Sequence, residues 1–95
     1  MTLPPTPFTR PIGCRLPLQQ AGMGAITTPA LAAAVGAEGG LGMIAAAGHP
    51  AVTLVAQVTS ALEIAGDGAR VGVNFLMPFL DEEALEAATE IAAVV

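Results

Sequence analysis

Two glycines separated by one residue follow an apolar run near the start of the chain, in the segment 20–24 (Gln-Ala-Gly-Met-Gly). Glycine has no β-carbon, so such a turn lets the backbone approach a flat ligand closely. A tight turn that simply needs glycine explains the same residues equally well. The spacing also approaches a dinucleotide-binding fingerprint. That motif, however, needs a third glycine where Thr27 stands and an acidic residue at the end of the next strand, which ends in alanines. A dinucleotide site is therefore excluded.

An amide side chain, Asn74, lies near the end of the apolar run 71–75. A buried amide needs hydrogen-bond partners, because leaving it unsatisfied is unfavourable. Its carboxamide offers both a donor and an acceptor, which suits the alternating carbonyl and N–H edge of a flavin ring. A hydrogen bond to the backbone of a neighbouring loop is an equally good interpretation of this residue.

The other polar residues favour structural roles. His49 precedes Pro50, and we interpret it as a polar cap at a helix start rather than as a base or an anion ligand. A zinc site is not expected, because the chain has one histidine and one cysteine, Cys14, which lies before the first strand. The acidic residues between 81 and 90 are typical of a solvated helix face. The sequence predicts neither a metal site nor a catalytic residue.

Short apolar runs alternate with helical patterns along the chain. Strands are predicted over Leu16–Gln20, Leu41–Ala46 and Val71–Phe75. Helices are predicted from a Thr-Pro start at 28–29 to Gly39-Gly40, from His49-Pro50 to the break at 66–68, and from a cap at Asp81 onward. The segment Ile91–Val95 fits either a fourth strand or the tail of the last helix. The proline-rich residues 1–15 are expected to form an irregular arm over the bottom of the fold.

This order predicts an α/β fold, β-α-β-α-β-α-β, with a parallel sheet and crossover helices. Ligands of such folds bind beyond the carboxyl ends of the strands, so the segments 20–28, 45–50 and 74–80 should share one rim. A barrel of eight such units needs about 250 residues. We therefore expect residues 16–95 to be the first half of a barrel domain that follows the arm 1–15. A complete four-stranded open sheet is the alternative.

Composition excludes several classes of partner. The net charge is −5, and the cations are three arginines, which cannot form a basic patch for nucleic acid or for an anionic membrane. Hydrophobic residues make up 54% of the chain, but Pro, Gly, Gln, Thr and His interrupt its uncharged stretches, so no membrane span is expected. A single cysteine forms no internal disulfide, which fits a reducing cytoplasm.

Four pieces of the sequence, in this order and spacing, together resemble the nitronate monooxygenase family, formerly called 2-nitropropane dioxygenases. They are Pro17–Gly24 (PLQQAGMG), Thr28–Val35 (TPALAAAV), Gly39–Gly42 (GGLG) and Gly72–Phe75 (GVNF). The resemblance covers most of residues 16–80. It implies an FMN-dependent (β/α)8 barrel, of which this chain is the N-terminal fragment. It further implies that Ala21, Gly22, Met23 and Gly24 lie against the isoalloxazine ring and that Asn74 bonds its polar edge.

The resemblance implies an oxidoreductase that oxidises alkyl nitronates with O2 to carbonyl compounds and nitrite. Because the family includes FMN-dependent enoyl-acyl-carrier-protein reductases and quinone reductases, these are a second candidate activity. A non-catalytic small α/β binding module is a third. Many relatives have Pro where Gly22 stands. The family's catalytic His and phosphate loops belong to the second half of its barrel and are not among these 95 residues, so the chain alone is expected to retain little flavin and to be inactive.

Overall fold

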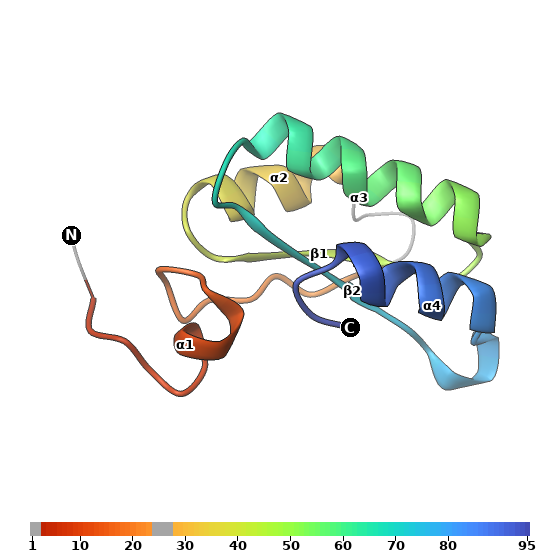
Figure 1. The fold of residues 1–95 in the computed structure, drawn as a ribbon, viewed down its shortest axis with the longest axis horizontal. Coiled ribbons are helices and arrows are strands. Elements are labelled where there is room, and N and C mark those ends of the chain that lie inside the picture. The colour runs from red at the N-terminus through yellow and green to blue at the C-terminus, as the bar shows by residue number, and fades with distance from the viewer. Residues whose placement is uncertain (1–2, 24–27) are drawn as a thin grey trace.

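Two parallel strands form the centre of the computed structural model, which describes residues 3–23 and 28–95 (Figure 1). β1 (Leu41–Ala45) pairs with β2 (Arg70–Asn74), with Leu41 opposite Arg70 and Ala45 opposite Asn74. Side chains alternate between the two faces of a strand, and directly paired residues share a face. One face, called the inner face below, therefore carries Leu41, Met43, Ala45, Gly72 and Asn74.

Three helices cover the opposite face of the sheet (Figure 1). They are α2 (Pro29–Ala37), α3 (Ala51–Ala65), which links the two strands, and α4 (Glu82–Ile91). Ile44, Val71 and Val73 on the strands and Leu54 and Val58 on α3 form the centre of this core. Alanines from all three helices complete it, so the backbones approach closely.

The ends of the helices follow the chemistry that the sequence predicts. The Thr28 hydroxyl accepts a hydrogen bond from the Leu31 N–H at 3.1 Å, and Pro29 begins α2. Gly39, with a φ of 100°, follows the end of that helix in a conformation that glycine tolerates best. The Asp81 carboxylate accepts from the Ala84 N–H at 3.1 Å and caps α4. These cap predictions are confirmed.

The predicted first strand, Leu16–Gln20, is wrong in extent, because the segment makes only an isolated parallel bridge between Gln19 and Leu41. Pro17 has no N–H, and the Leu18 N–H is bonded to the Leu16 carbonyl at 2.8 Å in a tight turn, so the first residues cannot pair with β1. The bridge still fixes the direction of this segment, which runs parallel to β1 on the side away from β2.

The end of the chain combines the two alternatives left open by its sequence. α4 continues to Ile91, and the residues beyond it hydrogen-bond to β2 without forming a strand. The Ala93 N–H donates to the Val71 carbonyl at 2.8 Å, and the Val73 N–H donates to the Val94 carbonyl at 2.9 Å. The predicted four strands are therefore two strands flanked on each side by a short hydrogen-bonded segment, all in chain order.

The arm before residue 16 contains one short helix, α1 (Thr9–Ile12), which the proline-rich composition did not lead us to expect. Thr6 and Thr9 hold its start: the N–H of each donates to the hydroxyl of the other, at 2.8 and 3.0 Å. After α1 the arm meets the amino end of the sheet, where the Arg15 N–H donates to the Gly39 carbonyl. Among the described residues, no helix is both long and apolar enough to cross a membrane.

The contact between β1 and α2 gives a test of the fold. A β-carbon at Gly42 would lie 2.8 Å from the Ala32 carbonyl carbon, a backbone atom that cannot move without displacing α2. We expect Gly42→Ala to lower the free energy of unfolding by about 3 kcal/mol, as overpacking of a tight core does. Gly48→Ala is the control, because Gly48 has a φ of 81° but open space around it, so that only backbone strain of about 1 kcal/mol applies. Urea unfolding measures both, and equal losses would contradict the packing described.

Candidate functional site

The carboxyl ends of the parallel segments bring the predicted site residues to one rim. Asn74 is the last residue of β2, and Ala45 is its partner at the end of β1. Residues 20–23 follow residues 16–19, called the bridged segment below, which lie on the other side of β1. The only titratable side chain among the described residues of the three segments that follow these ends is His49. The described residues of these rim segments therefore include no permanently charged side chain.

Asn74 and Gly22 are in direct contact at this rim. The Asn74 Nδ2 group donates to the Gly22 carbonyl oxygen at 3.4 Å. A β-carbon at residue 22 would lie 2.7 Å from the Asn74 Cγ atom, closer than real β-carbons approach, so a glycine is needed while the carboxamide stands here. Because the two residues come from opposite sides of β1, their hydrogen bond spans the end of that strand. Ala45 lies on the same face as Asn74 and is small enough to permit it.

The acceptor of the Asn74 carboxamide is not satisfied. Its Oδ1 atom is buried and has no hydrogen-bond partner in the part of the chain that the structure describes. A buried acceptor without a partner destabilises a folded protein by about 1–3 kcal/mol. Such an atom marks a position where a ligand donor would be stabilising, and it is the only buried side-chain nitrogen or oxygen of this kind among the described residues.

The remaining predicted residues of the glycine turn lie beside this contact. Ala21 and Met23 are exposed, Met23 to 48%, while Gly22 between them is half-buried. Gly24 lies outside the described residues. The structure thus brings Gly22 and Asn74 together and places Ala21 and Met23 next to them. Their contact with a flavin stays a prediction.

Two features of this rim were not found from the sequence. The Gln20 carboxamide accepts from the Met43 N–H at 3.3 Å, and its Nε2 group donates to the Met43 carbonyl at 3.3 Å. The loop after Asn74 exposes Leu76, Met77 and Phe79, on and beside a 3-10 helix η1 (Met77–Phe79). The apolar run in a loop position is a signal that could have indicated the second feature, because large apolar side chains are seldom exposed together without a function.

The predicted helix cap at His49 is wrong, whereas the acidic residues of α4 are solvent-exposed as predicted. His49 does not cap α3: the residue before that helix is Pro50, and no side chain makes a cap bond there, so this interpretation is wrong. The acidic residues of α4 are exposed, as expected for a solvated face. Within residues 3–23 and 28–95 no group of three metal-ligating side chains is found.

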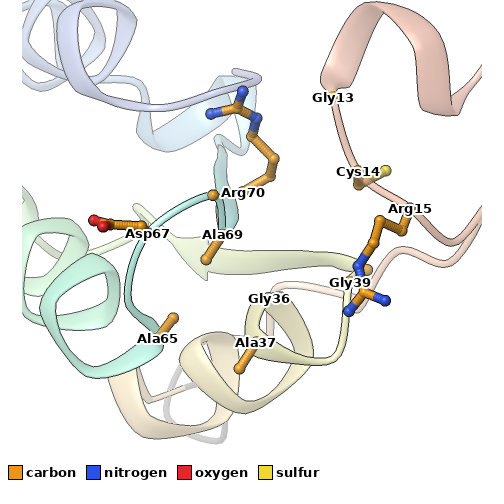
Figure 2. A pocket seen from close by; sticks show the side chains of 12 residues that line it. Gly13, Cys14, Arg15, Gly36, Ala37, Gly39, Ala65, Asp67, Ala69 and Arg70 are labelled. Atoms are coloured by element: carbon orange, nitrogen blue, oxygen red, sulfur yellow. The ribbon is translucent and has the colours of Figure 1, made fainter.

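A cavity of about 230 Å³ lies at the opposite, amino end of the strands (Figure 2). Cys14 lines it, and the Arg15 and Arg70 side chains border it, with Arg15 over Gly39 and Arg70 beside Gly13. Both α2 and α3 end here, and a helix C-terminus attracts cations and repels anions. The cationic side chains at this end therefore suit the nearby helix C-termini, and the cavity is separate from the rim that carries Asn74.

A model of the nitronate monooxygenase family matches residues 6–94 of the chain. Neither the curated proteins nor the solved structures give a significant match. The match includes both sides of the rim, the glycine turn as well as Asn74, and it covers nearly the whole chain. The chain therefore belongs to the nitronate monooxygenase family, whose name describes oxidoreductases.

Proposed function

We propose that the rim formed by Ala21, Gly22, Met23 and Asn74 binds the isoalloxazine ring of FMN in an oxidoreductase of nitronate monooxygenase type. The single observation that carries this proposal is the unsatisfied, buried Oδ1 atom of Asn74 beside the backbone of Gly22. Family membership supports it, because these enzymes are flavin-dependent in general. A bare backbone and an amide that lacks one partner are what a flat ring with a polar edge requires.

The proposal extends to the fold. Four segments lie side by side in chain order, the two central strands are parallel, and α2, α3 and α4 cover the same face of the sheet. This arrangement is compatible with the first strands of a (β/α)8 barrel, in which the inner face would point to the barrel axis and ligands would bind at the carboxyl-end rim. In such a barrel the phosphate of FMN is held by loops after the last strands, and this rim would hold only the ring.

The residues of this chain would position the cofactor and the substrate. FMN, when bound, supplies the redox chemistry. Asn74 would orient the polar edge of the ring, because rotation about its Cβ–Cγ bond is soft and can turn either amide atom toward it. The exposed Leu76, Met77 and Phe79 would exclude water and contact the alkyl group of a nitronate. The overall reaction proposed is oxidation of an alkyl nitronate by O2 to a carbonyl compound and nitrite.

Purification of the protein expressed from its full reading frame tests the proposal. We expect bound flavin with absorbance between about 370 and 450 nm, since the chemistry resides in the cofactor. We also expect release of nitrite from an alkyl nitronate in the presence of O2. Oxidation of NAD(P)H with an enoyl or quinone acceptor, without nitrite, would instead assign the reductase activity. Absence of flavin binding would leave a non-catalytic module and contradict the proposal.

Replacement of the Asn74 amide should separate binding from stability. We expect Asn74→Leu to raise the Kd for FMN at least tenfold, because the ring edge loses its partner. The melting temperature should change little, because the variant removes both a buried acceptor that has no partner and the 3.4 Å hydrogen bond to the Gly22 carbonyl. Flavin fluorescence titration and thermal unfolding measure the two quantities.

Gln19→Leu is the matched control for this variant, since Gln19 is an exposed amide on the bridged segment. It should leave the Kd for FMN within twofold of the unchanged protein. A Kd that Asn74→Leu does not change, or changes no more than Gln19→Leu does, would show that Asn74 does not contact the ring.

A further inference from the structure

The hydrogen bonds to β1 come from backbone groups of the bridged segment up to Gln20, and from the side chain of Gln20 after that. The Leu41 N–H donates to the Leu18 carbonyl at 2.8 Å, and the Gln20 N–H donates to the Leu41 carbonyl at 3.0 Å. These two bonds are the regular parallel pattern around Gln19. If the pattern continued, the Met43 N–H would donate to the backbone carbonyl of Gln20, and the Met43 carbonyl would accept from the Gly22 N–H.

The side chain of Gln20 occupies both of those places. Its Oε1 atom accepts from the Met43 N–H at 3.3 Å, and its Nε2 group donates to the Met43 carbonyl at 3.3 Å. The second N–H of the amide is directed to the Ala21 carbonyl at 3.4 Å. All the donors and the acceptor of this half-buried carboxamide are therefore used.

Because the Gln20 side chain takes the place of these backbone groups, residues 21–23 are not held in the sheet. Because a side chain satisfies Met43, the backbone of Gly22 is not needed in the ladder, and its carbonyl accepts from Asn74 instead. If the bridged segment continued as a strand through residue 22, the Gly22 carbonyl would point toward β1 within the sheet. It could not then accept from the Asn74 side chain, which reaches across the end of β1.

We propose that Gln20 is the positioning residue of the rim: its carboxamide ends the pairing with β1 and holds the turn 21–23 beside Asn74, where the flavin ring binds. The inference rests on the proposed function, and it adds a residue whose side-chain hydrogen bonds, within the described part of the chain, all go to backbone groups. Both the oxygen and the nitrogen of the Gln20 carboxamide are needed, because the backbone of Met43 presents one donor and one acceptor.

The test uses Gln20→Glu, which keeps the shape of the side chain. The ionised carboxylate still accepts from the Met43 N–H but repels the Met43 carbonyl, whereas the protonated acid supplies an O–H that restores the second bond. Relative to the unchanged protein at the same pH, the Kd for FMN should be at least tenfold higher at about pH 8 and fall toward equality at about pH 4, where a glutamate side chain is largely protonated. Comparison at each pH removes the titration of the FMN phosphate itself.

Two further variants complete the design. Gln20→Met has neither donor nor acceptor, so its Kd for FMN should be raised by the same factor at both pH values. Gln19→Glu places the same charge on the exposed neighbouring side chain and should bind like the unchanged protein throughout. Each titration is run well below the melting temperature of the variant at that pH, so that loss of folding does not contribute.

The outcomes separate the two proposals. A raised Kd for Gln20→Glu that recovers with acid, beside a raised and constant Kd for Gln20→Met, supports the positioning role. If the unchanged protein binds FMN but Gln20→Glu binds equally well at about pH 8, or does not recover, the role of Gln20 is overturned and the flavin site stands. If the unchanged protein binds no FMN, both proposals fall.

Discussion

The contact between Asn74 and the backbone of Gly22 is the constraint on which the candidate site depends. It joins residues 52 positions apart in the chain and spans the end of β1. It requires parallel neighbours on both sides of that strand, a small residue at Ala45 and no β-carbon at residue 22. Each of these conditions is met by a different part of the sequence. The acceptor of Asn74 nevertheless has no partner in the described chain, so the contact leaves one buried polar atom unsatisfied.

The two ends of the strands differ in their side chains. At the amino end, where helices α2 and α3 terminate, Arg15 and Arg70 lie close to glycines of neighbouring segments, and the Arg15 N–H of the arm donates to the Gly39 carbonyl. At the carboxyl end, the described residues of the segments 20–28, 45–50 and 74–80 include no Asp, Glu, Lys or Arg, and apolar side chains of the loop after β2 are exposed. This division agrees with the general behaviour of parallel α/β folds, in which one rim stabilises and the other binds. Between the two rims, Gly42 lets α2 pack closely on β1.

Much of the fold follows from local signals in the sequence. The helices were predictable because Thr28, Asp81 and Gly39 are strong start and stop residues, and the two central strands because they are short apolar runs between such signals. The flanking segments were not, because their pairing is decided by individual backbone groups: Pro17 and the turn around it remove donors, and Gln20 replaces the backbone with its side chain. At the site, the rim position of Gly22 and Asn74 followed from the strand order. The role of Gln20 did not, because nothing in a sequence indicates which side chain will imitate a neighbouring strand.

The central claim is that a flavin ring binds at the rim of Gly22 and Asn74. The most direct measurement is a titration with FMN of the isotope-labelled protein expressed from its full reading frame, followed by backbone and side-chain amide chemical shifts. The account predicts that the largest changes occur at Gly22, at Ala45 and Ala46, and at the side-chain amide of Asn74, and that Gly13, Gly39 and Arg70 around the amino-end cavity are unaffected. Changes confined to that cavity, or no changes at the rim at saturating FMN, would contradict it.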